Sequence, residues 1–232
     1  MTARLVVALE PDEDDLALLE GYARLAAELR RELVALLVDD PGFGHALALP
    51  FVRLQPRMAT APGELGPGAA RRALELFRAR AERRLVEACR GLEVSWRLSV
   101  VAALPPPGVG DILVFGPRGA GAGLPKHAAC PIVLRRRTGR SIAVVYEGTA
   151  ETLELAATVA RRERLPVAVL VVAEDAAVAA RLAAEASAAF GADSLLPADR
   201  PLATLAALRP RAVVLDACNA SLRLADVAAA LA

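Results

Sequence analysis

Four glycines crowd a short stretch after an apolar run, and this stretch has the chemistry to bind a phosphate. The run Ile112–Phe115 leads into the loop of DILVFGPRGAGAG, which covers residues 111–123. Glycine lets backbone N–H groups approach a phosphate closely, and Arg118 adds a positive charge inside the loop. The alternative is a tight turn between two strands, because a short glycine-rich loop is a weak motif alone. The glycines are Gly116, Gly119, Gly121 and Gly123.

The composition of the 232 residues argues against several function classes. Lys and Arg total 28 and Asp and Glu total 27, so the basic excess typical of nucleic-acid binders is missing. Aromatic residues make up only 3% of the chain, too few for platforms that stack on single strands. No apolar run approaches the roughly 20 residues that span a bilayer, and the strand-like start RLVVALE is unlike a signal peptide. We therefore expect a cytoplasmic protein.

The cysteines and histidines give no sign of a metal centre or a catalytic pair. Three widely separated cysteines argue against both a disulfide framework and a zinc site. His127 has no visible partner nucleophile, so it is predicted to pack at a turn. We expect no catalytic residue and no metal ligand in this chain.

Strand and helix patterns alternate through the first part of the chain. Apolar runs over 5–9 and 33–38 predict buried strands, with a helix between them that begins at the acidic positions 12–15. A second helix is predicted over 70–90, and an alternating strand over 93–101 suits a sheet edge. Strands over 112–115 and 131–134 follow. Residues 41–69 contain five prolines and five glycines and are predicted to form an irregular insertion.

The same pattern restarts after a basic segment over 135–140, RRRTGR. The arginines of this segment either bind an anion or form a solvated linker, and the linker is the ordinary interpretation. SIAVVYE over 141–147 echoes RLVVALE, and AVVL over 212–215 echoes ILVF. Helices are predicted over 149–164, 175–190, 201–208 and 221–231, and strands over 167–173 and 194–196.

Repeated strand–helix alternation predicts an α/β protein with parallel sheets covered by helices. We expect two tandem, doubly wound, parallel-sheet domains over 1–137 and 141–232, packed against each other as a pseudo-dimer. The second domain is truncated, because it lacks a fifth strand. We expect strand 131–134 of the first domain, or a second molecule, to pair with the edge left open.

With its elements in this order, the first domain resembles a universal stress protein domain. The strand RLVVALE with an acid at its end, the strand LVALLVDD, and DILVFGPRG followed by KHAACPIVL are in that family's order. The piece from His127 to Leu134 is the most specific, since the family often has His-Ala-Pro-Cys-Pro before its last strand. The chain resembles a tandem, diverged member with a universal-stress-like, adenine-nucleotide alpha hydrolase-like fold.

The resemblance implies an ATP site at the carboxyl ends of the first domain's strands. Glu10 would meet the ribose, the backbone of Val38 would meet the adenine, and the glycine loop would hold the phosphates. The loop departs from the family pattern Gly-x2-Gly-x9-Gly-[Ser/Thr], because Ala129 and Cys130 occupy its last two positions. The predicted nucleotide contacts are Glu10, Val38, Gly116, Arg118, Gly119, Gly121 and Gly123.

The second domain is predicted to bind no nucleotide. Its corresponding loop, DACNAS over 216–221, has no glycine, and Asp216 would repel a phosphate. Glu147 corresponds to Glu10 and would either meet a ribose or cap the next helix.

The resulting expectation is a regulatory or adaptor protein of the stress-response type rather than an enzyme. It would act by self-association, as a dimer, or through a protein partner, without nucleic acid and without a membrane span. No resident cofactor is expected, and ATP would bind weakly at most. The alternative is an ATP-binding universal stress protein with slow or no hydrolysis.

Overall fold

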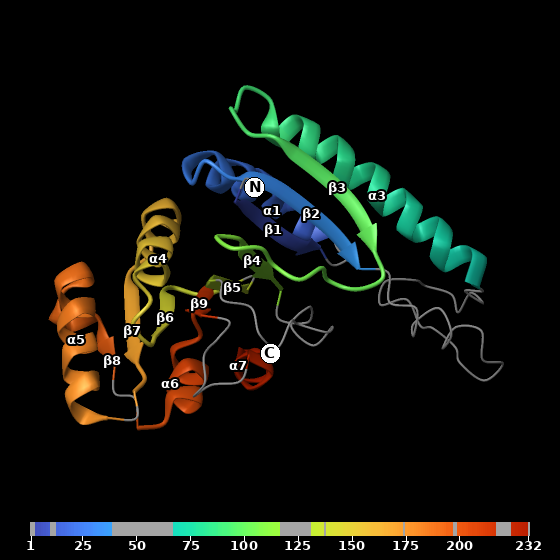
Figure 1. Cartoon of the computed structure of the whole chain (residues 1–232). Coiled ribbons are helices and arrows are strands. Elements are labelled where there is room, and N and C mark those ends of the chain that lie inside the picture. Colours follow the sequence, from blue (N-terminus) through green and yellow to red (C-terminus); the bar gives the residue numbers. More distant parts are fainter. Residues whose placement is uncertain are drawn as a thin grey trace, which may run out of the picture.

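A computed structural model of the chain shows one mostly parallel sheet with helices on both faces (Figure 1). It describes residues 3–9, 13–38, 67–116, 131–136, 138–173, 175–196, 199–216 and 224–231. Within these ranges the sheet has nine strands in the order β3-β2-β1-β4-β5-β9-β6-β7-β8. The predicted α/β class is confirmed.

Most elements lie where the hydrophobic patterns predict them. The strands are β1 (Arg4–Leu9), β2 (Glu32–Val38), β3 (Trp96–Val101), β4 (Ile112–Phe115), β5 (Pro131–Arg135), β6 (Ile142–Tyr146), β7 (Val167–Val171), β8 (Leu195–Leu196) and β9 (Ala212–Asp216). The α-helices are α1 (Glu13–Glu28), α3 (Pro67–Cys89), α4 (Ala150–Glu163), α5 (Ala176–Phe190), α6 (Pro201–Leu208) and α7 (Leu224–Leu231).

Two boundaries differ from the sequence-based prediction. Helix α3 begins at Pro67, so the last residues of the predicted insertion 41–69 are helical, and proline suits the first helical position because it has no N–H to pair. Strand β3 begins at Trp96 rather than at residue 93, although it does lie at a sheet edge. Helix α7 lies within the predicted range 221–231, and residues 221–223 lie outside the described part. Residues 39–66 lie outside the described part.

The strand order reads the same from both edges toward the centre. From one edge it runs β3-β2-β1-β4, and from the other it runs β8-β7-β6-β9, with β5 between the two sets. Every neighbouring pair is parallel except β5 and β9, which are antiparallel. The first half (β1 to β5) and the second half (β6 to β9) are therefore related by an approximate two-fold axis that passes through β5, perpendicular to the sheet.

The prediction of two sheets packed against each other is wrong, because the two halves form one continuous sheet. Strand β5 pairs with β4 on one side and with β9 on the other, with Val133 opposite Val214. The expectation that strand 131–134 would fill the open edge of the second half is confirmed. The physical reason is that each half would otherwise end in a strand with unpaired backbone N–H and C=O groups. Strand β5 pairs these groups for both halves. The domain division between residues 137 and 141 stays a prediction.

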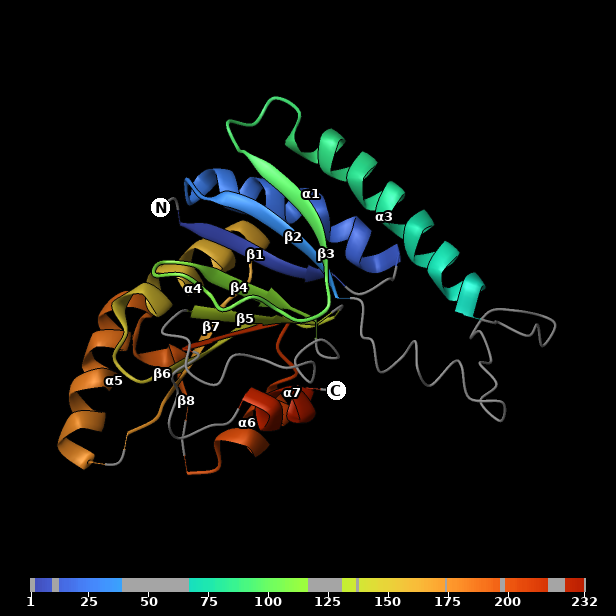
Figure 2. The ribbon, with the colours of Figure 1, turned by 45° about the vertical axis from the view of Figure 1, so that its right-hand side comes forward.

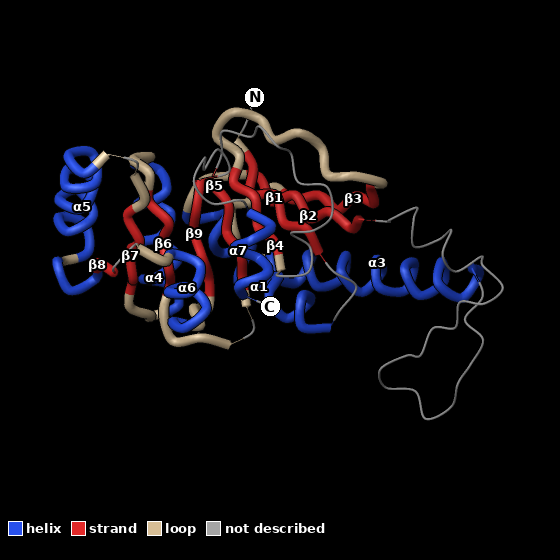
Figure 3. Tube along the Cα trace, turned by 90° about the horizontal axis from the view of Figure 1, so that it is seen from below, coloured by secondary structure: helices blue, strands red, loops and turns tan. Residues whose placement is uncertain are grey.

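Helices α1, α3, α4 and α5 cover one face of the sheet, here called the helix-rich face, and α6 and α7 cover part of the other (Figure 2). This follows from right-handed crossovers, because β1 to β3 and β6 to β8 both step outward from the centre. The amino-terminal part of α3 extends past the strands (Figure 3), where Leu76 is 62% exposed. On the opposite face of the first half, Leu104 packs against the core from the proline-rich connection between β3 and β4.

Candidate functional site

The topology creates two places where ligands commonly bind in open α/β sheets. Each lies at the carboxyl ends of two neighbouring strands whose following connections leave in opposite directions. The first-half switch point lies between β1 and β4, and the second-half switch point lies between β6 and β9. Because β5 and β9 are antiparallel, the strands of the two halves point in opposite directions. The carboxyl ends of the first-half strands, with their switch point, therefore lie on the side of the sheet opposite to the second-half switch point.

Two of the predicted nucleotide contacts lie together at the first-half switch point, at the carboxyl ends of the strands. Val7 lies opposite Val114 and Leu9 opposite Leu37, so Val38, the last residue of β2, and Gly116, which follows β4, lie on either side of the end of β1. Strands two places apart are separated by roughly 10 Å, so these residues flank the end of β1. The other predicted contacts lie outside the described residues: Glu10, Arg118, Gly119, Gly121 and Gly123.

The second-half switch point carries a hydroxyl–carboxylate contact that closes it. The Thr149 hydroxyl donates a hydrogen bond to Oδ2 of Asp216 over 2.5 Å, which joins the start of α4 to the end of β9. Thr149 is the N-cap residue of α4, but its side chain makes no capping bond to the helix backbone. The carboxylate of Asp216 thus stands near the positive end of α4, where an anionic ligand would otherwise bind.

A second carboxylate and a glycine shape the same place. One carboxylate oxygen of Glu147, Oε1, is buried without a hydrogen-bond partner, so the predicted capping of the next helix is not observed for this atom. Gly148 has φ of 113°, and a Cβ there would lie 3.2 Å from Cδ2 of Leu182. A glycine is therefore required at this turn to fit the backbone against α5. Glu147 follows β6 and Asp216 is the last residue of β9, so two acidic residues lie at these strand ends.

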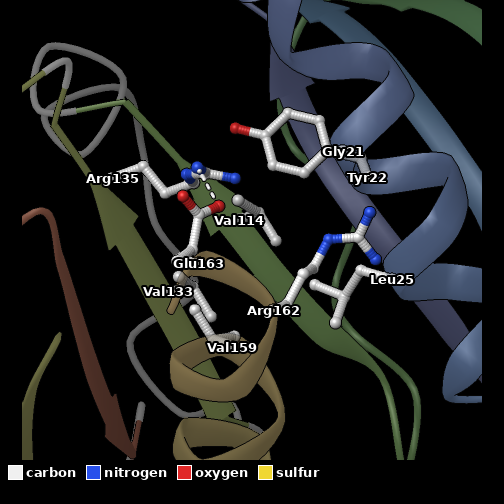
Figure 4. Close-up of a pocket in the computed structure, with 9 residues that line it drawn as sticks. All are labelled: Gly21, Tyr22, Leu25, Val114, Val133, Arg135, Val159, Arg162 and Glu163. Atoms are coloured by element: carbon white, nitrogen blue, oxygen red, sulfur yellow. Dashed lines mark hydrogen bonds and ion pairs between the residues drawn. The ribbon is translucent and has the colours of Figure 1, made fainter. Parts of the chain in front are cut away.

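A buried polar cluster lies on the helix-rich face near the centre of the sheet (Figure 4). The predicted linker 135–140 is wrong at its first residue, because Arg135 belongs to β5 and is 8% exposed. Its Nη2 donates to Oε1 of Glu163 over 2.8 Å, and its guanidinium carbon lies 5.3 Å from the centre of the Tyr22 ring. Arg211 forms an ion pair with the other oxygen of Glu163 at 3.3 Å. Burial is tolerated because the charge has both a carboxylate and an aromatic face.

Burial changes the acid–base behaviour of two groups in this cluster. It raises the pKa of the Tyr22 phenol well above its ordinary value, so the hydroxyl keeps its proton near neutral pH. It lowers the pKa of Arg162, which extends from α4 toward α1. Sequence patterns single out neither residue, because an apolar helix face predicts Tyr22 as core and a helix end predicts Arg162 as solvated.

An ion pair at the amino ends of the first-half strands anchors the segment that precedes the glycine loop. Asp111, 1% exposed, accepts hydrogen bonds from the backbone N–H of Arg4 at 3.0 Å and of Gly108 at 2.7 Å, and it pairs with the Arg4 side chain. Burial alone would raise the pKa of Asp111, but the bonds from Arg4 and Gly108 outweigh it and hold the pKa below its usual value. Asp111 therefore has a structural role. It lies at the amino end of β4, whereas Gly116 lies at the carboxyl end of the same strand.

The described residues contain no group of three or more His, Cys, Asp or Glu side chains placed to hold a metal ion. In the same part of the chain, every helix is too short or too polar to cross a membrane.

Comparisons with known proteins return likenesses to solved structures alone. No family model and no curated protein matches the chain. Among solved structures, it is similar to a universal stress protein from Archaeoglobus fulgidus DSM 4304, at 12% identity over 92% of this chain and 95% of that chain. The TM-score is 0.46. The fold assignment rests on this chain's own strand pairing, since so low a score does not establish a common fold.

Proposed function

We propose that this chain is a universal-stress-like regulatory or adaptor protein that acts by association rather than catalysis. In this proposal ATP binds weakly at most, and only at the first-half switch point. The observation that carries it is the difference between the switch points, where β4 is followed by Gly116 and β9 ends in Asp216. A glycine admits a phosphate to the backbone, whereas a carboxylate repels it.

The geometry of the first half supports the location of the nucleotide. Val38 and Gly116 flank the end of β1, so an adenine near one and phosphates near the other would lie across the switch point. This same observation favours the second candidate function, an ATP-binding protein with slow or no hydrolysis. The two candidates differ in affinity and in turnover.

The hydrogen bond between Thr149 and Asp216 supports a second half without nucleotide. A phosphate at that switch point would have to displace this contact and lie near the carboxylates of Asp216 and Glu147. Each of these carboxylates would repel the phosphate.

Calorimetry with Mg-ATP tests the proposal. We expect a dissociation constant approaching about 1 mM, because the loop lacks two of the family's phosphate anchors and each is worth about 1.5–3 kcal/mol. Gly119→Glu should abolish the signal, and Ala206→Glu, which adds the same charge at an exposed position of α6, should leave it unchanged.

Each outcome separates the candidates. Submicromolar affinity would favour the ATP-binding alternative, and ATP hydrolysis above the buffer rate would reject the non-catalytic role. Binding that survives Gly119→Glu would place the nucleotide elsewhere. No binding at millimolar ATP would leave association as the remaining function, to be measured by sedimentation of the pure protein and by capture of partners.

A further inference from the structure

A small enclosed space lies between α1 and α4, over β4 and β5 (Figure 4). It is on the helix-rich face and at the centre of the sheet, away from both switch points. Its floor is apolar, with Val114 and Val133, and its volume is enough for about one water molecule. An organic ligand or a nucleotide therefore does not fit, but a monatomic ion does.

The walls of this space carry more positive than negative charge. Arg135 and Arg162 both line it, and Glu163 is the single carboxylate among the lining residues. Glu163 is already engaged on both oxygens, since Oε1 accepts from Arg135 and Oε2 pairs with Arg211. The carboxylate is thus shared between two guanidinium groups and is not available to a third.

Two donor groups remain unused at this position. Nε of Arg135 is buried and has no hydrogen-bond partner. Arg162 is half-buried and makes no hydrogen bond or ion pair with any described residue. Of the charged groups on α1 that face Arg162, Glu28 favours its charge and Arg24 opposes it, but both are exposed to solvent, which screens them. Buried N–H donors without acceptors are costly, and a bound anion removes that cost.

We propose that one small monatomic anion, of the size of chloride, binds in this space between Arg135 and Arg162. The two guanidinium groups supply N–H donors, and the valines of the floor add no polar group that competes for them. The protonated hydroxyl of Tyr22, which also lines the space, is a further possible donor. A tetrahedral oxyanion such as phosphate is too large for a space of one water molecule.

The position of the site gives the anion a structural consequence. Its walls come from α1, β4 and β5 of the first half and from α4 of the second half. Binding therefore cross-links the two halves at the approximate two-fold axis, and it should stabilise the folded chain by mass action. This inference is independent of the proposed nucleotide site, which lies at the carboxyl ends of β1 and β4.

Thermal unfolding at constant ionic strength tests the proposal, with sodium chloride compared with sodium gluconate. Chloride at about ten times its dissociation constant should raise the unfolding midpoint by roughly 3–6 °C. Arg162→Gln should abolish the difference between the salts without lowering the midpoint in gluconate, because it removes a charge that lacks a partner. Arg161→Gln is the matched control, since Arg161 is the exposed neighbour on the same helix, and it should keep the chloride response.

Crystals grown in bromide give a second readout that does not depend on any variant. An anomalous peak between Arg135 and Arg162 would support the site, and a water molecule or empty density there would overturn it. Equal midpoints in chloride and gluconate for the wild type would also overturn the proposal. So would an equal chloride response in Arg162→Gln and Arg161→Gln, or stabilisation by sulfate or phosphate but not by chloride.

Discussion

The two halves of the sheet share a strand order but end differently at their switch points. In the first half, the described strand ends carry Val38 and Gly116, neither of which has a charged or polar side chain. In the second half, Thr149 and Asp216 bond to each other across the corresponding place, with Glu147 beside them. The same strand order therefore carries chemically different residues at the two switch points. The comparison teaches that the fold provides the place for a ligand, while a few side chains at the strand ends decide whether it is used.

The largest expected effect concerns what the halves have in common, the shared strand β5. Val133 is 2% exposed and pairs on both sides, so Val133→Asp buries a charge without a partner and should cost more than about 3 kcal/mol. We expect both halves to unfold together, in urea titrations followed by far-ultraviolet dichroism and by the single tryptophan, Trp96.

Val100→Asp is the control for this experiment, because Val100 lies in edge strand β3 and is 39% exposed. Its cost should stay within about 0.5 kcal/mol. Two separate transitions in wild-type protein, one with and one without the tryptophan signal, would show that the halves fold independently despite the common sheet.

A smaller effect is expected at the amino ends of the strands, where the halves also differ. The first half has the pair of Arg4 and Asp111, and the second half has a backbone bond from Arg211 to Ser141 at 2.7 Å. Asp111→Asn should lower the free energy of unfolding by about 2–3 kcal/mol at pH 7, because it leaves buried donors poorly satisfied.

The loss at Asp111 should depend on pH in a defined direction. The pKa of Asp111 is lowered in the folded state, so its contribution is present above the unfolded-state pKa of about 3.9 and disappears as the pH falls through the folded-state value. Urea titrations of both proteins between pH 7 and pH 2 should therefore show a difference in unfolding free energy that shrinks as the pH falls below about 3.9. A constant difference over this range would show that the charge of Asp111 is not what stabilises the strands.

The smallest expected effect is at the second-half switch point. Thr149→Val removes the donor to Asp216 and should cost about 1–2 kcal/mol in thermal or urea unfolding, since the lost bond is to a carboxylate. Thr204→Val is a matched control, because the Thr204 hydroxyl bonds only a backbone carbonyl within its own helix region. An equal loss of unfolding free energy in the two variants would mean that the bond to Asp216 stabilises the fold no more than a bond to a backbone carbonyl.

Much of the fold could be predicted from the sequence, because buried strands and amphipathic helices leave local patterns. The pairing of β5 with β9 could be predicted only as one of two alternatives, since these strands lie about 80 positions apart and no local pattern decides between strand 131–134 and a second molecule. The same limit applies to side chains. Arg135 belongs to a basic run that is typical of a linker, and only Tyr22 and Glu163, distant in sequence, explain its burial.

The candidate site was predictable in part for the same reason. Val38 ends one predicted strand and Gly116 follows another, so the parallel sheet places both residues at the carboxyl ends of the strands. The sequence places Thr149 only at the start of a predicted helix, and its bond to Asp216 spans 67 positions. Contacts between residues so far apart in the sequence form only in the assembled sheet, so no local sequence pattern predicts them.

The measurement that tests the central claim most directly is an ATP titration of protein labelled with ¹⁵N-glycine and ¹⁵N-valine, followed by amide chemical shifts. The claim is that any nucleotide occupies the first-half switch point and never the second. The account predicts shifts at Gly116 and Val38 that grow up to millimolar ATP, with Gly148 and Val172 unchanged. Equal or larger shifts at Gly148 would show that Thr149 and Asp216 do not close the second switch point, and would contradict the account.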